Sequence, residues 1–307
     1  MKSIIVNNLT KTYGKKTEKV LAVDDVSFDV NPGEIFGLIG PDGAGKTSIF
    51  RMLTTVLLPD SGSASIEGFD MVKDYKKIRK ILGYMPGRFS LYQDLTIEEN
   101  LEFFASVFNT TIAENYDLIK DIYVQIEPFK DRRAGKLSGG MKQKLALCCA
   151  LIHKPKVLFL DEPTTGVDPV SRKEFWEMLQ RLKLQGITMV VATPYMDEAA
   201  LCDRIALMQH GKVLSINTPS TISNSYPDLL FEVKAGRTAN VLRALENFDQ
   251  KKNVYAYGEF VHLSVEQNEN FGIENITEYL KKEGFENIEI NTIKASIEDS
   301  FIRLLSN

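Results

Sequence analysis

Cysteine and histidine are scarce in this sequence, with three of each among its 307 residues. Cys148, Cys149 and Cys202 are odd in number and lack the paired spacing of zinc sites. This pattern excludes a disulfide framework and the common kinds of zinc centre. We therefore expect reduced thiols, as in the cytosol, and predict that Cys148 and Cys149 pack inside a helix.

Long apolar runs and an excess of basic residues are also missing. No stretch approaches the roughly 18 consecutive apolar residues of a transmembrane helix. The start, Met1-Lys2-Ser3-Ile4-Ile5-Val6, is typical of a strand rather than of a signal peptide. The 37 basic and 41 acidic residues give a net charge of −4, so no global positive field favours nucleic acid. We expect a cytoplasmic, water-soluble chain without a nucleic-acid partner.

A glycine-rich loop is the first positive signal. The run Gly40-Pro41-Asp42-Gly43-Ala44-Gly45-Lys46-Thr47, followed by Ser48, fits the phosphate-loop pattern G-x-x-x-x-G-K-[ST]. A buried strand is predicted before it, at 34–39, and a helix after it, at 48–53. In this order the glycine N–H groups can surround phosphate oxygens, Lys46 can reach the β- and γ-phosphates, and the Thr47 hydroxyl can ligate Mg²⁺.

Two acids follow a second apolar strand, in Val157-Leu158-Phe159-Leu160-Asp161-Glu162-Pro163. Open α/β sheets bind their ligands at the carboxyl ends of such strands. Asp161 is predicted to hold the water shell of the metal, and Glu162 to polarise the attacking water as a general base. A solvated turn is the alternative for the pair taken alone, but its place after a phosphate loop favours a catalytic role.

The run Leu137-Ser138-Gly139-Gly140-Met141 lies between these two motifs. A serine and two glycines at a helix start expose backbone N–H groups where the helix dipole favours an anion. Taken alone, the run is also typical of an ordinary loop or helix cap. A second anion-binding element in a chain that already has a phosphate loop requires an explanation.

Together with Gly166-Val167-Asp168, these motifs resemble the ATP-binding subunits of ABC transporters over residues of about 3–220. The resemblance implies an α/β fold of the P-loop NTPase class, with a mixed sheet core and a helical subdomain at about 88–155. It implies ATP and Mg²⁺ as cofactors, with Tyr13 stacking on the adenine, although a plain strand-edge role for Tyr13 stays open.

The resemblance also implies partners. Two such domains dimerise head to tail, so that residues 137–141, the signature, face the ATP of the partner and Asp168 lies in the loop between the subunits. A separate integral membrane permease would hold the subunit at the inner face of the cell membrane. The whole pattern is most similar to exporters of drugs or lipophilic molecules. The stretch Arg88-Phe89-Ser90-Leu91-Tyr92 is expected near the permease contact, although its aromatic residues could equally belong to the core.

Three positions depart from the family pattern. Gly87 stands where the family has a glutamine that ligates Mg²⁺, and Pro194 where it has a histidine that contacts the γ-phosphate. Asp42 replaces the usual Asn or Ser and brings a negative charge near the polyphosphate. Glycine has no side-chain ligand, and proline has neither a side-chain donor nor a backbone N–H. The sequence therefore predicts a site that binds MgATP but hydrolyses it slowly, with partial compensation by Arg88 or Thr193 left open.

A weakened site favours a heterodimer with a second, competent ATPase subunit. A homodimer with two slow sites and a purely regulatory nucleotide-binding protein are the alternatives. A non-transport ABC protein acting on ribosomes or DNA is disfavoured, because the sequence has a single phosphate loop, no basic run and no sustained heptads.

Polar residues near 217–221 predict a boundary between an ATP-binding domain at 1–220 and a small accessory domain at 226–307. The second domain is predicted to be an α+β, ferredoxin-like fold of order β-α-β-β-α-β. Its strands are expected at 230–233, 254–257, 260–263 and 287–293, and its helices at 239–247, 273–283 and 297–305. The run Ser296-Ile297-Glu298-Asp299-Ser300-Phe301 is similar to one that ends such domains in some family members, and a structural or dimer-bracing role is expected.

Overall fold

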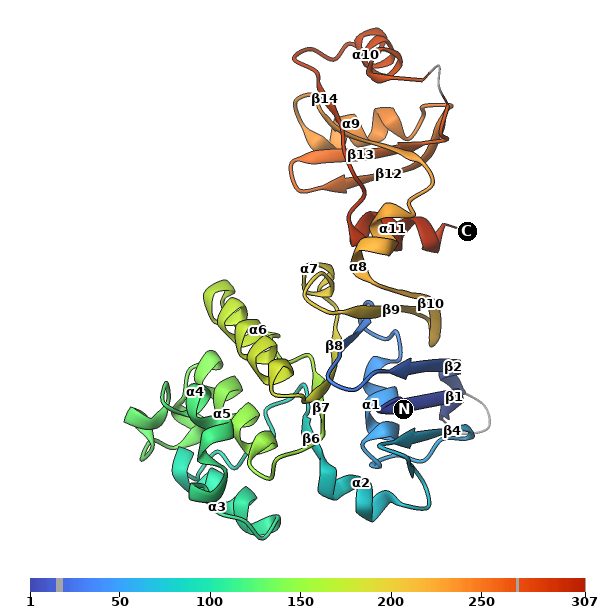
Figure 1. Ribbon diagram of the computed structural model, residues 1–307. Coiled ribbons are helices and arrows are strands. Elements are labelled where there is room, and N and C mark those ends of the chain that lie inside the picture. The colour runs from blue at the N-terminus through green and yellow to red at the C-terminus, as the bar shows by residue number, and fades with distance from the viewer. Residues whose placement is uncertain (15–18, 269–270, 307) are drawn as a thin grey trace. The chain divides into compact units, whose positions relative to one another are not determined.

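The computed structural model describes residues 1–14, 19–268 and 271–306 (Figure 1). Its contacts divide the chain into two compact units, Met1–Thr218 and Pro219–Asn307. Among the described residues, no helix combines the length and the apolar character that crossing a bilayer requires.

The first unit contains a four-stranded antiparallel sheet in the order β2-β1-β4-β5. Its strands are β1 (Ile4–Tyr13), β2 (Val20–Val30), β4 (Ser61–Ile66) and β5 (Phe69–Asp70). The predicted N-terminal strand is therefore present, and it continues to Tyr13. One face of the sheet is buried, as the alternation of buried and exposed residues at the start of β1 shows.

A second sheet of six strands has the order β10-β9-β3-β8-β7-β6. Its strands are β3 (Ile35–Ile39), β6 (Leu82–Met85), β7 (Val157–Asp161), β8 (Thr188–Thr193), β9 (Arg204–Gln209) and β10 (Lys212–Asn217). All neighbours pair in parallel except β10, which pairs antiparallel with β9. Because β3, β7 and β8 run in the same direction, the loops that follow them lie at one edge of the sheet.

One hydrophobic core joins both sheets and the helix α1 (Lys46–Leu53). Phe28 of β2 stacks on Phe36 of β3 at 5.2 Å between ring centroids, and Phe50 of α1 meets Phe159 of β7 edge to face. β3 and β7 are buried along their whole length, which is typical of strands covered on both faces. The helices α2 (Tyr75–Ile81), α6 (Pro169–Leu184) and α7 (Met196–Ala199) complete this part.

A group of helices lies between β6 and β7 in the sequence and forms the green region of Figure 1. It contains α3 (Ile97–Val107), α4 (Tyr116–Tyr123) and α5 (Gly139–Leu151), with short 3₁₀ turns at Ala113–Asn115, Glu127–Phe129 and Ala134–Lys136. A capping box begins α3: Glu99 N donates to Thr96 Oγ1 at 3.1 Å, and Thr96 N donates to Glu99 Oε2 at 2.7 Å. Cys148 and Cys149 are buried in α5, as predicted.

The second unit begins with α8 (Pro219–Asn224) and has the predicted order β-α-β-β-α-β. The elements are β11 (Leu229–Lys234), α9 (Thr238–Leu245), β12 (Lys251–Tyr257), β13 (Phe260–Val265), α10 (Ile273–Lys282) and β14 (Glu289–Thr292), followed by α11 (Ile297–Leu305). The strands form an antiparallel sheet in the order β12-β13-β11-β14. β14 begins at Glu289 rather than at 287, because Asn287 has a left-handed φ of 50° that a strand does not accommodate.

A buried carboxylate ties α11 to this sheet. Asp299 is 1% exposed and accepts hydrogen bonds from His262 Nδ1 at 2.7 Å and from the Tyr255 hydroxyl. It also accepts from the amide and the hydroxyl of Ser296, both at 2.6 Å, as part of a capping box.

The α/β class predicted for the chain, with a mixed sheet core and a helical part, is confirmed.

Candidate functional site

The phosphate loop lies between β3 and α1, in the predicted order of strand, loop and helix. Two of its glycines are required by close packing. A Cβ on Gly40 would lie 2.3 Å from the carbonyl oxygen of Met208, and one on Gly45 would lie 2.4 Å from that of Ala22. Gly45 also has a φ of 102°, which side chains rarely adopt. These contacts hold the loop backbone tightly curled at the start of α1.

Lys46 is 4% exposed, and its ammonium group covers carbonyl oxygens of the loop. Its Nζ lies 2.7 Å from the oxygen of Gly40 and 3.0 Å from that of Pro41. Burial lowers the pKa of Lys46, while the charges of Glu162, Asp42 and Asp161 oppose that shift. A buried ammonium group that donates to backbone carbonyls is suited to bind an incoming polyanion.

Thr47 and Asp161 meet across the edge of the sheet. The Thr47 hydroxyl donates to Asp161 Oδ1 at 3.2 Å. Burial raises the pKa of Asp161 to about 6, opposed by the hydrogen bond from Thr47. Both groups offer the hard oxygen ligands that Mg²⁺ prefers. The described residues contain no cluster of three or more His, Cys, Asp or Glu that could hold a metal alone, but Mg²⁺ commonly takes only one or two protein ligands beside phosphate and water. The residues therefore fit this ion.

Glu162 follows β7 in a left-handed conformation, with a φ of 49°. Its backbone N–H donates to the carbonyl of Ala192 in β8 at 2.8 Å. A non-glycine residue in this region costs about 1–3 kcal/mol and persists only where its surroundings hold it. The Glu162 side chain lines two cavities, one of about 380 Å³ at the phosphate loop and one of about 190 Å³ beside α5.

The larger cavity combines residues 42–48 of the loop with residues that the sequence did not point to. These are Val20, Leu21 and Ala22 at the start of β2, and His210 in the turn between β9 and β10. His210 and Gly211 both have positive φ values, and Gly211 N donates to the carbonyl of Ala44 at 3.1 Å. A two-residue hairpin turn could have been anticipated there, but its contact with the loop could not.

Tyr13 ends β1 next to the loop helix. Its hydroxyl lies 3.2 Å from Ser48 Oγ, and its side chain is half-buried. Among the described residues that line the larger cavity, Tyr13 is absent and Val20, Leu21 and Ala22 take that side. Its role toward adenine therefore stays a prediction.

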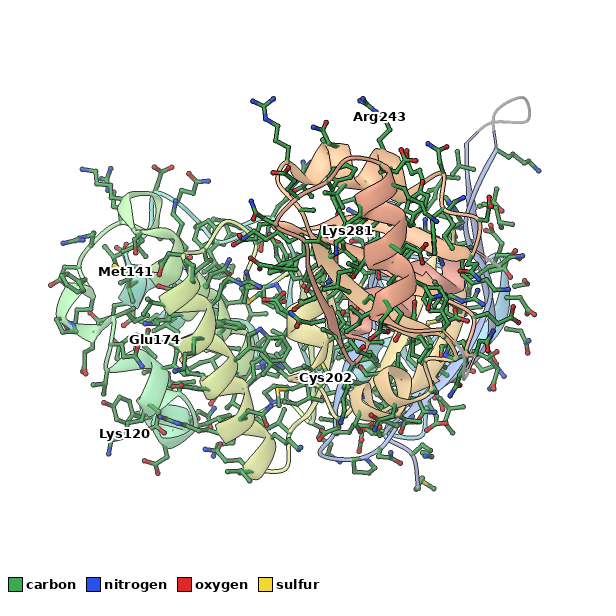
Figure 2. The ribbon with its side chains drawn as sticks, turned by 90° about the horizontal axis from the view of Figure 1, so that it is seen from above. Lys120, Met141, Glu174, Cys202, Arg243 and Lys281 are labelled. Atoms are coloured by element: carbon green, nitrogen blue, oxygen red, sulfur yellow. The ribbon has the colours of Figure 1, made fainter. Side chains whose placement is uncertain are left out.

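The signature begins a helix, as predicted. Ser138 is the N-cap of α5 and accepts a hydrogen bond from Met141 N at 3.3 Å. Figure 2 shows Met141 and Glu174 on α5 and α6, two helices that Lys144 and Glu174 join by an ion pair of 2.8 Å. Within the described part of the chain, no residue of 137–141 lines the phosphate-loop cavity. Gly139 instead lines the smaller cavity, which Glu162 also borders.

Gly87 lies against the acidic strand end. A Cβ at this position would be 3.1 Å from the carbonyl oxygen of Asp161 and 3.6 Å from Glu162 Cβ. Together with Gly139 and Gly166, Gly87 lines the smaller cavity. Gln93 lies elsewhere, because its carbonyl accepts a hydrogen bond from Gly135 N at 2.9 Å in the segment before the signature.

Pro194 directly follows β8. The preceding Thr193 is 1% exposed, and its hydroxyl donates to Glu198 Oε2 at 2.6 Å while accepting from Tyr195 N at 3.1 Å. The hydroxyl hydrogen is thus already used inside the protein. Compensation for the missing histidine by Thr193, left open above, is wrong for this structure. Arg88 is exposed.

Asp168 caps α6 and is exposed. Its Oδ1 accepts hydrogen bonds from Val170 N at 3.1 Å and Ser171 N at 3.0 Å. These bonds lower the pKa of Asp168, with Ser171 as the largest cause. Gly166 lies next to the signature, because a Cβ on Gly139 would be 3.3 Å from its carbonyl oxygen.

The stretch 88–92 is partly surface and partly core. Leu91 is buried, at 8% exposure. Tyr92 is 52% exposed and packs edge to face on Phe103 at 4.8 Å, so the core alternative for the aromatic residues is wrong for Tyr92. Phe89 is half-buried, with Lys142 Nζ 5.4 Å from its ring centre.

Comparison with known proteins gives consistent matches. A family model described as ABC transporter matches residues 23–165. "Probable multidrug ABC transporter ATP-binding protein YbhF" of Escherichia coli (strain K12) is 37% identical over 306 residues, which cover 98% of this chain and 52% of that protein. The chain thus spans about half the length of YbhF.

"Doxorubicin resistance ATP-binding protein DrrA" of Mycobacterium tuberculosis (strain ATCC 25618 / H37Rv) is 37% identical over 234 residues, which cover 75% of this chain and 70% of DrrA. Among solved structures, an ATP-binding cassette in a dimeric post-hydrolysis state bound to ADP and Pi superposes with a TM-score of 0.64. It is 25% identical, and the match covers 70% of this chain and 98% of the cassette.

Proposed function

The chain belongs to the ABC transporter ATP-binding proteins, and on this premise we propose that it binds MgATP and hydrolyses it to drive transport through a separate membrane permease. The observation that carries the proposal is the convergence of Lys46, Thr47 and Glu162 on one cavity at the carboxyl edge of the six-stranded sheet. Loops of this edge supply a polyanion cradle, a metal-ligating hydroxyl and a carboxylate side by side.

Each residue has a definable task in this reaction. The backbone N–H groups of the loop and the Lys46 ammonium hold the phosphates, and the N-terminus of α1 adds its dipole. Thr47 and Asp161 would hold Mg²⁺, which supplies charge neutralisation on the phosphates. The backbone of Glu162 is held by the hydrogen bond from its N–H to the carbonyl of Ala192. Its carboxylate orients a water and accepts the proton of that water.

Hydrolysis at this site is proposed to be slow. The position of Gly87 touches the backbone of Asp161 yet offers no side-chain oxygen, and Pro194 offers no donor. Losing one preorganised donor typically costs about 10²–10³ in kcat, and effects within one site do not add. MgATP affinity depends on the loop, Lys46 and Thr47, all of which are present, so binding is expected to be preserved.

The signature is proposed to serve a partner. Among the described residues, those of the signature do not line the phosphate-loop cavity of their own chain, which supports an ATP held between the loop of one chain and the signature of another. Because the site of this chain is weak, the partner is expected to be a second, non-identical ATPase subunit with an intact glutamine and histidine. The intact signature here would then complete the competent site.

The permease contact is proposed to involve the exposed aromatic group at the start of the helical region. Tyr92 and Phe103 pack on each other at 52% and 38% exposure, and Phe89 lies close by in sequence. An apolar pair of this kind fits the cytoplasmic helix of a membrane protein. The chain would then be peripheral on the inner face of the membrane, and the names of the two relatives support an exporter.

The unit 219–307 is proposed to be an accessory domain that braces the dimer.

Restoring the two missing groups tests the slow-site proposal. Gly87→Gln and Pro194→His are introduced together, with Gly87→Ala plus Pro194→Ala as the matched control for backbone effects. We expect the restored protein to hydrolyse MgATP at least about tenfold faster than the unmodified protein, with unchanged MgATP affinity. Equal rates would refute the slow site, and loss of MgATP binding in the Lys46→Ala variant would support the assignment of the loop.

A partner test separates the alternatives. A permease and a second ATPase that co-purify with the full chain would support the heterodimeric transporter. A symmetric dimer of this chain that hydrolyses MgATP would support the homodimer, and MgATP binding without any permease would favour the regulatory alternative.

A further inference from the structure

Glu198 of α7 is buried at 2% exposure and connects three segments around the proposed catalytic acid. Its Oε1 accepts a hydrogen bond from the Thr164 hydroxyl at 2.6 Å and from Arg172 Nη2 at 3.0 Å. Its Oε2 accepts from the Thr193 hydroxyl at 2.6 Å. These partners lie in the loop after β7, in the first turns of α6, and at the end of β8.

Arg172 is the cationic partner in this network. Its guanidinium lies 4.4 Å from the ring centre of Tyr195, and Nη2 lies 3.1 Å from Asp197 Oδ2. It stands one turn after Asp168, the residue that caps α6 and that the family resemblance places in the loop between two subunits. Displacement of the start of α6 would therefore pull directly on Glu198.

The loop 162–168 has few other anchors. At its start, Glu162 N donates to the carbonyl of Ala192, and at its end, Asp168 caps α6. Between them, the side-chain bond that reaches across to another element is the one from Thr164 to Glu198. Glu162 has a left-handed φ that its surroundings must maintain, and the Thr164 bond fixes the backbone two residues later. The hydroxyl of the next residue, Thr165, lies 3.4 Å from Glu162 Oε2, so this segment also contacts the carboxylate itself.

We propose that Glu198 is a positioning residue for ATP hydrolysis, which orients Glu162 through Thr164 and links it through Arg172 to the partner-facing start of α6. The inference rests on the proposed ATPase function and adds to it a coupling between Asp168 and the catalytic acid Glu162. A buried carboxylate with three donors has one stable arrangement, so the loop, α6 and the end of β8 move together.

The chain contains a matched control pair at the opposite edge of the same sheet. Arg204 Nε lies 2.6 Å from Glu34 Oε1, with side-chain exposures of 25% and 6%, against 23% and 2% for Arg172 and Glu198. Arg204 also lies 3.1 Å from a second carboxylate, on Asp29, and 5.3 Å from the ring centre of Phe36. Glu34 precedes β3, whereas the phosphate loop follows it.

The experiment compares Glu198→Gln with Glu34→Gln in the full chain. Four quantities are measured: thermal stability, the Kd for MgATP, the rate of a single turnover with protein in excess over ATP, and hydrogen exchange of the amides of 163–171. We expect both variants to lose similar stability and to keep MgATP affinity within about threefold. Only Glu198→Gln should slow the single turnover, by at least about tenfold, and speed exchange in 163–171.

A gentler pair covers the case in which Glu198→Gln does not fold. Thr164→Val removes only the hydroxyl, while Thr164→Ser keeps it. The valine variant should therefore have a slow single turnover and fast hydrogen exchange in 163–171, and the serine variant should resemble the unmodified protein in both. Equal single-turnover rates in Glu198→Gln and Glu34→Gln, or unchanged exchange in 163–171, would overturn the proposal. If the unmodified protein does not hydrolyse ATP, the proposed function fails, and the exchange comparison still decides whether Glu198 holds the loop.

Discussion

Gly87 lies so close to Asp161 that a Cβ at position 87 would be 3.1 Å from the carbonyl oxygen of Asp161. The first belongs to the segment after β6 and the second ends the neighbouring parallel strand β7. Position 87 therefore lies beside the strand end that carries Asp161 and Glu162.

This contact predicts a measurable cost for any side chain at position 87. Gly87→Ala is expected to lower the free energy of unfolding by about 1 kcal/mol, because the Asp161 carbonyl lies in a central strand that cannot easily yield. Thermal denaturation of the full chain checks this. Glycine-to-alanine at Gly139, where the new Cβ would be 3.3 Å from the Gly166 carbonyl in an exposed loop, is the control and should cost less.

Lys46→Ala is expected to weaken MgATP binding about 10- to 100-fold, since one charge-assisted contact is worth roughly 1.5–3 kcal/mol. Equilibrium binding of radiolabelled ATP measures the change. Lys183, which pairs with Asp203 at 2.5 Å outside the cavity, supplies the control variant Lys183→Ala. Equal losses of affinity in both variants would contradict the assignment of the phosphate loop.

Ser138→Ala should reduce hydrolysis in the assembled complex more than Glu162→Gln does, because the signature would serve the competent site of the partner. Removing an N-cap also costs about 0.5–2 kcal/mol of stability. Thr96→Ala removes an equivalent cap, with a 3.1 Å bond to Glu99 N, and controls for that loss. Turnover of the complex is the measurement, and equal effects of Ser138→Ala and Glu162→Gln would indicate two equivalent sites.

Asp299→Asn should destabilise the second unit by about 3 kcal/mol, because it leaves buried donors without their charged acceptor. Hydrogen exchange of β13 in the full chain reports the loss. The partly exposed neighbour Glu298, in the same first turn of α11, gives the control Glu298→Gln, which should be nearly neutral.

The Asp299 bonds also predict a pH dependence. Burial raises the pKa of Asp299, but hydrogen bonds from His262, Ser296 and Tyr255 together lower the pKa by more than burial raises it. The net pKa therefore lies below its ordinary value of 3.8. A depressed pKa means that the stabilisation is complete above the unfolded value and is lost as pH falls below about 3.8. Acid titration of β13 protection should show this loss in the unmodified protein and not in Asp299→Asn.

Local spacing predicted much of the chain correctly. The phosphate loop between strand and helix, the helix start at Ser138, and the element order of the second unit all depend on residues within a few positions of one another. Side-chain periodicity and capping chemistry act over that range, so they can be read without the fold.

The contacts that the sequence did not predict have a different origin. His210 lines the phosphate-loop cavity, and the Thr193 hydroxyl is taken by Glu198, although neither contact has a local signal beyond a turn or a short helix. The two acids Asp161 and Glu162 were recognised from a strand end, but their contact with Gly87 depends on the pairing of β6 with β7.

The sequence by itself determined which chemical groups the protein carries and the absence of a side-chain ligand at Gly87 and of a donor at Pro194, because those are properties of residue types. Only the tertiary structure decided which groups meet. Parallel strands bring the ends of β3, β7 and β8 to one edge, and close packing there places Glu198, Thr164 and Arg172 in one buried cluster. Contacts between segments distant in sequence arise from that packing, which no local pattern encodes.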